Sequence, residues 1–100
     1  MLFRSKHSRN MKGLEAKIQK QIIDALEKRG YFVINLIKTN KNGIPDLIAL
    51  KDKHKALFIE VKQSTGQTTK LQDYMIKQLN NKGFVSFIAK SVDDVLTRIE

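Results

Sequence analysis

The chain of 100 residues has no cysteine, no tryptophan, one proline and two histidines. Without cysteine it can form neither a disulfide framework nor a thiolate metal site, and this suits a reducing cytoplasm. His7 and His54 are too few and too far apart in the sequence for a zinc site. No apolar run approaches the roughly 18 residues of a membrane span, and no apolar stretch follows the basic N-terminus as in a secretory signal.

Acidic residues are also scarce, since 10 Asp and Glu face 19 Lys and Arg, which leaves a net charge of +9. The hydrophobic fraction of 41% is sufficient for one core, and the length suits one domain. A strongly basic small domain favours a polyanionic partner such as a nucleic acid. Residues 1–12 contain four basic residues, no acid and no helical or strand period. We therefore predict a flexible basic arm over 1–12 and a single domain over 13–100.

Apolar periodicity predicts the order helix, three strands, helix, strand, helix. The first helix follows apolar residues every four positions from Leu14 and ends near Gly30. A polar turn of hairpin length joins the second and third strands, so these two are antiparallel. The expected strands cover 31–37, 46–51, 56–63 and 84–89, and the two later helices lie between Leu71 and Gly83 and after Ser91. The predicted fold class is α/β, with a mixed sheet that contains an antiparallel hairpin and is flanked by helices.

The third strand carries the most informative exception to its own pattern. Apolar residues occupy one face, whereas Glu60 and Lys62 lie side by side on the other. Asp46, directly after Pro45, lies about as far from the turn at 52–55 as Glu60 does. We therefore expect the carboxylates of Asp46 and Glu60 to converge at the open end of the hairpin, beside Lys62.

Two adjacent carboxylates repel each other unless a cation lies between them. Mg²⁺ takes oxygen ligands, and the carbonyl of Val61, between Glu60 and Lys62, is a natural further ligand. Such an ion polarises a phosphodiester and activates water, while Lys62 would orient or help deprotonate that water, or offset charge on phosphorus. The pattern thus indicates hydrolysis of phosphodiester bonds with a hard divalent ion such as Mg²⁺.

Two further polar residues interrupt the apolar stripes of the helices. Glu15 lies on the stripe of the first helix, and Gln72 lies on that of the second. Both are explained if the helix N-termini point toward the metal site. Glu15 would then supply a third carboxylate or bind a metal-bound water, and Gln72 would hydrogen-bond the site or the scissile phosphate. In the alternative interpretation, Glu15 only complements its helix dipole and Gln72 lies at the rim.

At these residues the sequence resembles the PD-(D/E)xK nuclease superfamily, and more closely its VRR-NUC (virus-type replication-repair nuclease) branch. The matching motifs are G-I-P-D at Gly43–Asp46, I-E-V-K at Ile59–Lys62 and T-K-L-Q at Thr69–Gln72, with Glu15 upstream. The resemblance extends from about Leu14 to Ala89, nearly the whole domain. It implies a restriction-endonuclease-like core and dependence on Mg²⁺ or Mn²⁺.

The resemblance also implies roles for individual residues and a class of substrate. The expected catalytic residues are Asp46, Glu60, Lys62 and Gln72, and the expected metal ligands are Glu15, Asp46, Glu60 and Val61. Short stand-alone members of this branch, often from phages, are similar to Holliday-junction resolvases and act as homodimers on branched DNA. We therefore expect a homodimeric endonuclease acting on four-way junctions, in the cytoplasm of a bacterial cell or a phage-infected host.

Three alternatives remain open. Members of the branch that are embedded in large repair proteins act on flaps, so a flap or repair nuclease is one of them. A basic module that binds nucleic acid without catalysis would also explain the net charge, but it has no need for Asp46 and Glu60 beside a phosphate backbone. An RNA-binding protein fits the charge too, although no platform of exposed aromatic residues is evident in the sequence.

Overall fold

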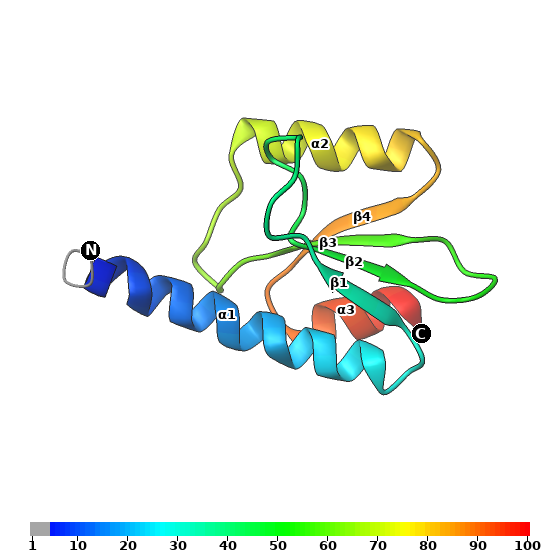
Figure 1. Ribbon diagram of the computed structural model, residues 1–100, viewed down its shortest axis with the longest axis horizontal. Helices are drawn as coiled ribbons and strands as arrows, with labels where there is room; N and C mark the ends of the chain where they lie inside the picture. The colour runs from blue at the N-terminus through cyan, green and yellow to red at the C-terminus, as the bar shows by residue number, and fades with distance from the viewer. Residues whose placement is uncertain (1–4) are drawn as a thin grey trace.

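The computed structural model describes residues 5–100 of the protein, with side chains from Gly13 onward. In chain order the elements are α1 (Ser5–Glu27), β1 (Phe32–Asn35), β2 (Leu47–Leu50), β3 (Leu57–Val61), α2 (Lys70–Asn81), β4 (Val85–Ala89) and α3 (Val92–Ile99) (Figure 1). The four strands form one sheet in the order β1-β2-β3-β4. β1, β2 and β3 are antiparallel, whereas β4 runs parallel to β3. The predicted element order and mixed sheet are therefore confirmed.

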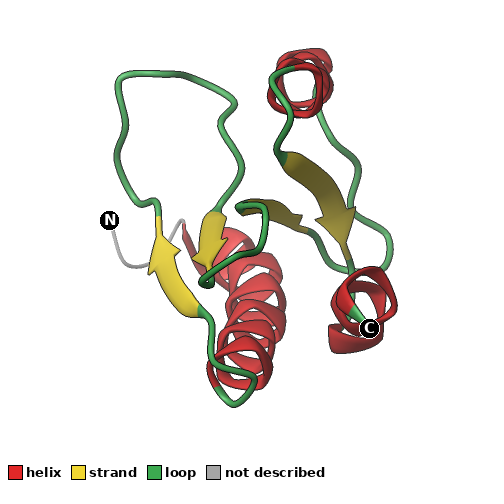
Figure 2. Ribbon diagram, turned by 90° about the vertical axis from the view of Figure 1, so that its right-hand side faces the viewer, coloured by secondary structure: helices red, strands yellow, loops and turns green. Residues whose placement is uncertain are grey.

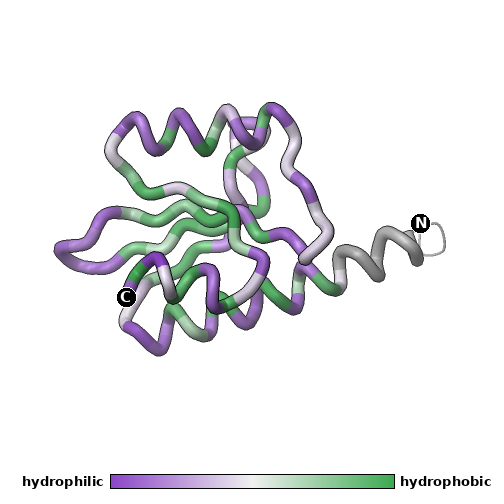
Figure 3. Tube along the Cα trace, turned by 180° about the vertical axis from the view of Figure 1, so that it is seen from behind, coloured by the Kyte–Doolittle hydropathy of each residue, from purple (hydrophilic) through white to green (hydrophobic). Residues whose placement is uncertain are grey.

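The helices lie on both faces of the sheet. α1 and α3 cover one face and α2 covers the other (Figures 1 and 2). The buried core lies mainly between the sheet and the α1–α3 layer, and the strands form the apolar centre of the molecule (Figure 3). Its members are Ile22, Leu26, Tyr31, Leu47, Ala49, Leu57, Ile59, Val61, Phe87, Ala89 and Val95. No side chain of α2 is fully buried, so this second layer is the thinner one.

The first helix is longer than the apolar period indicates. α1 begins at Ser5, so residues 5–12 of the predicted flexible arm are helical, whereas residues 1–4 lie outside the described part of the chain. Residues 5–12 contain no proline or glycine that would stop a helix from extending past Gly13. They also carry no apolar stripe, so periodicity could not predict that the helix extends over these residues. The division into an arm and a domain stays a prediction.

The first strand is shorter than predicted, and a long loop follows it. β1 ends at Asn35 instead of reaching residue 37. The N–H of Leu36 still donates to the carbonyl of Asp46 at 2.7 Å, so the two ends of the loop are joined where it leaves the sheet. This bond places the start of the loop beside the start of β2.

The outer edge of β4 is closed by a side chain of α2. Val85 donates its N–H to Ala56, on the inner side toward β3. Backbone groups alternate along a strand, so those of Ser86 point outward. The Asn80 amide donates to the Ser86 carbonyl at 3.0 Å and accepts from the Ser86 N–H at 2.7 Å. Asn80 therefore takes the place of a neighbouring strand.

No helix within residues 5–100 is both long and apolar enough to cross a membrane.

Candidate active site

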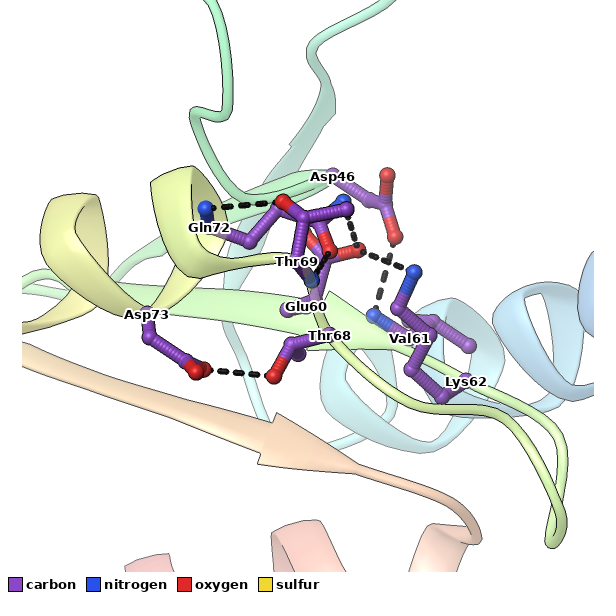
Figure 4. A network of polar contacts seen from close by, with 8 residues as sticks. All are labelled: Asp46, Glu60, Val61, Lys62, Thr68, Thr69, Gln72 and Asp73. Atoms are coloured by element: carbon purple, nitrogen blue, oxygen red, sulfur yellow. Dashed lines mark hydrogen bonds and ion pairs between the residues drawn. The ribbon is translucent and has the colours of Figure 1, made fainter.

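The register of the β2–β3 hairpin brings the two predicted carboxylates together. Leu47 pairs with Ile59, so the next position along the ladder sets Asp46 opposite Glu60. Opposed residues of a ladder share a face of the sheet. Asp46 is also held in place, because its Oδ2 accepts the N–H of Val61 at 2.9 Å (Figure 4). The convergence predicted from the length of the turn is confirmed.

Glu60 has an ionisable side chain, yet it is only 2% exposed. Its Oε2 accepts a hydrogen bond from Nε2 of Gln72 at 3.2 Å and lies 3.4 Å from Nζ of Lys62 (Figure 4). Its Oε1 is buried and has no hydrogen-bond partner among the side chains from residue 13 onward. Buried acceptors in proteins are nearly always paired, so this oxygen marks a place where a hydrogen-bond donor or a bound cation would fit.

The first turn of α2 orients Gln72. The Thr69 hydroxyl accepts the N–H of Gln72 at 3.1 Å, and Oε1 of Gln72 accepts the N–H of Thr69 at 2.9 Å. This reciprocal capping box commits the oxygen of Gln72 to the helix end and leaves its NH₂ group for Glu60. Thr68 donates to Asp73 and fixes the preceding residue as well. The predicted direction of Gln72 toward the site is therefore observed, and helix capping explains it.

Glu15 faces the site from the other layer. It lines a hollow of about 150 Å³ together with Gln19, Asp46 and Val61. Because α1 begins at Ser5, Glu15 lies well inside the helix, so the interpretation that it only complements the helix dipole does not hold. Sequence reasoning missed Gln19, although its spacing of four residues from Glu15 places it on the same helix face.

The acidic groups make one another harder to ionise. Burial and the charge of Glu15 raise the pKa of Asp46, against the opposing effects of the Val61 N–H and Lys62. Burial, followed by the repulsion of Asp46, raises the pKa of Glu60 to about 7 even though Lys62 lies beside it. Burial and mutual repulsion therefore both disfavour the ionised carboxylates, and a bound cation would offset this.

The donor set fits a hard divalent cation. Two carboxylates and a backbone carbonyl suit such an ion, which typically keeps several waters. The N–H of Val61 points toward Asp46, and the carbonyl of a strand residue points to the same side as its N–H. Within residues 13–100, no three acidic or histidine side chains form a metal-binding cluster on their own. Asp46 and Glu60 face each other across the hairpin, and the roles of these two residues and of Glu15 as metal ligands stay predictions.

Comparisons with known proteins agree with this geometry. The sequence model of the VRR-NUC domain matches residues 7–93. A solved structure of a VRR_NUC domain superposes with a TM-score of 0.75 at 24% identity, covering 86% of this chain and 94% of the other. A VRR_NUC domain protein superposes with a TM-score of 0.66 at 24% identity, over 85% and 84% of the two chains. At this identity the superpositions establish the fold, and no curated protein matches the sequence significantly. The chain therefore belongs to the VRR-NUC domain family, whose members are nucleases of the PD-(D/E)xK type.

Proposed function

We propose that the protein is a divalent-metal-dependent DNA endonuclease that acts on branched DNA, with the four-way junction as its preferred substrate. One observation carries the proposal: two facing carboxylates lie beside a lysine, and one buried carboxylate oxygen has no partner. The net charge of +9 supports a phosphate-rich substrate. Without a cation, Asp46 and Glu60 would repel that substrate.

Each residue of the site has a distinct task in this proposal. Asp46, Glu60 and the Val61 carbonyl would hold the cation, and Gln72 keeps the Glu60 carboxylate in position. A bound divalent cation supplies Lewis-acid polarisation of the phosphoryl oxygen. Lys62 orients the attacking water and offsets negative charge on phosphorus. A hollow of about 370 Å³ lies beside Lys62, and in this proposal it would receive the backbone of the cleaved strand.

Cleavage assays with labelled DNA test the catalytic proposal. Purified protein is incubated with four-way junction, flap, duplex and single-stranded DNA in Mg²⁺ or Mn²⁺. We expect cleavage of the junction that D46N and E60Q abolish. D52N is the matched control, because Asp52 is an acid in the turn at the far end of the same hairpin. Cleavage by D46N or E60Q at the wild-type rate, or no cleavage of any DNA by the wild type, would refute the proposal.

Mapped cut sites separate the two nuclease alternatives. Paired symmetric nicks across the branch point are the expected result for a resolvase. A single cut near a flap would identify a repair-type nuclease instead.

We also propose that the protein acts as a homodimer. Phe32, Ile34 and Leu50 are exposed, and strand pairing places them on one face of β1 and β2. α2 lies over β4 on that side of the sheet and leaves the β1–β2 part uncovered (Figure 2). A second copy seated on this face would bury these side chains and supply two active sites for two strands. Light scattering should give the mass of two chains for the wild type and of one chain for F32K; a monomeric wild type would refute the dimer.

A further inference from the structure

The loop between β1 and β2, residues 36–45, carries an unusual apolar side chain. Ile37 is 87% exposed, more than any other large apolar side chain from residue 13 onward. A lone exposed apolar residue is ordinary, so its significance depends on its surroundings. Lys38 follows it directly, Lys41 lies three residues further on, and no acid occurs in 36–45. The loop therefore combines an apolar tip with uncompensated positive charge.

The loop leads directly to the active site. Lys38, Lys41 and the exposed Ile37 line a hollow of about 460 Å³ together with Asp46. Asp46 is the carboxylate held against β3 opposite Glu60. A DNA strand whose phosphate lies at Asp46 would therefore pass the two lysines with its neighbouring phosphates.

The loop is also firmly supported. Thr39 donates its hydroxyl hydrogen to the Lys41 carbonyl at 2.8 Å, which shapes the turn near the tip. Gly43 has a φ of +78°, and a Cβ at this position would lie only 2.7 Å from Cγ of Leu71. The loop thus rises on the α2 side of the sheet and rests on the first turn of that helix (Figures 1 and 2). Gln72, which holds Glu60, belongs to the same turn, so one support positions both the loop and the catalytic carboxylate.

We infer that this loop recognises the branch point of the DNA. Lys38 and Lys41 bind phosphates next to the scissile one, and Ile37 packs against a base that is unstacked at the branch. Phosphate contacts give affinity for any DNA. Apolar side chains inserted between bases cost the energy of unstacking, which is lowest where stacking is already broken. The inference rests on the proposed function, because Asp46 sets the position of the scissile phosphate.

Binding in EDTA tests the loop without requiring cleavage. Fluorescence anisotropy compares a labelled four-way junction with a linear duplex of the same length, over a range of salt concentrations. K38Q/K41Q is matched by K53Q/K55Q, which removes the same charge from the exposed turn at the opposite end of the hairpin. We expect K38Q/K41Q to weaken binding of both DNAs by about tenfold or more and to reduce the salt slope by about two. Equal losses in the two double variants would overturn the role of the lysines.

The ratio of junction affinity to duplex affinity tests the role of Ile37. We expect I37S to lower junction affinity by about tenfold, as loss of one apolar contact with an unstacked base predicts, and to leave duplex affinity unchanged. I37M, which keeps the apolar surface, should retain the preference for the junction. Unchanged junction binding by I37S, an equal loss on both DNAs, or a change in its mass by light scattering would each overturn the assignment. The mass change would instead place Ile37 between two copies. A wild type that binds junctions through this loop but does not cut them would refute the catalytic proposal alone.

Discussion

Neutralising Glu60 should make the metal-free protein more stable, even though the substitution removes a charge from an ion pair. The carboxylate is buried, one oxygen has no partner, and Asp46 repels it. E60Q keeps the shape of the side chain and resembles the protonated acid. Its amide retains an oxygen for Gln72, which donates to this position at 3.2 Å in the wild type.

The pKa of Glu60 sets the magnitude of this effect. A carboxyl pKa raised from 4.5 to about 7 corresponds, at about 1.36 kcal/mol for each pKa unit, to about 3 kcal/mol. The folded state holds the proton more tightly than the unfolded state does, so wild-type stability falls as the pH rises from 4.5 to about 7. Above that pH the wild type has lost all of the stability that the protonated Glu60 provides. E60Q should therefore be more stable by about 3 kcal/mol at pH 8, and the gain should nearly vanish by pH 4.

Urea unfolding in EDTA at pH 8 and pH 4 measures the difference, with thermal unfolding as a second readout. In a chain of this length the gain at pH 8 corresponds to a Tm higher by about 10 °C or more. E27Q is the control, because Glu27 is an exposed acid at the end of α1 and its neutralisation should change stability by less than about 0.5 kcal/mol. If E60Q is less stable than the wild type at pH 8, or gains equally at both pH values, the reasoning from burial and repulsion fails.

Three further outcomes follow from contacts at the site. Mg²⁺ should raise the Tm of the wild type in a concentration-dependent manner, and D46N should lose this response, as differential scanning fluorimetry would show. Q72A should lower the free energy of unfolding by about 1 kcal/mol at pH 8, since it removes half of the capping box; a stability equal to that of the wild type would contradict this. G43A should cost about 1–3 kcal/mol because of its positive φ and the contact with Leu71, and it should reduce junction binding more than duplex binding. If G43A unfolds at the same urea concentration as the wild type, the loop can move away from Leu71 without loss of stability, and this reasoning is wrong.

Much of the fold followed from local patterns, because each strand and helix has its own period. The facing positions of Asp46 and Glu60 followed from a short turn, since an antiparallel ladder fixes register over a few residues. The direction of Gln72 was also predictable, because a capping residue and an interrupted apolar stripe occur together at Thr69–Gln72.

Other features depend on contacts between segments that are distant in the sequence. Leu14 belongs to the apolar stripe of the first helix, yet it is 54% exposed, because a periodic stripe does not show which of its residues other elements cover. The approach of Gly43 to Leu71 joins a loop to a helix 28 positions away, and no local pattern marks it. The Oε1 atom of Glu60 is buried without a partner because of the way that other segments pack around it, and the periodicity of the sequence does not determine this packing.

The closure of β4 by Asn80 has a consequence for the behaviour of the protein at high concentration. A free strand edge is a template on which another chain can add a strand, and this is a common route to aggregation. Here a single amide occupies the outward N–H and carbonyl of Ser86, near the start of this edge strand. A second molecule therefore cannot pair with β4 at Ser86 without first displacing the Asn80 side chain of α2. The small domain can thus expose an apolar sheet face elsewhere and still resist polymerisation through this edge.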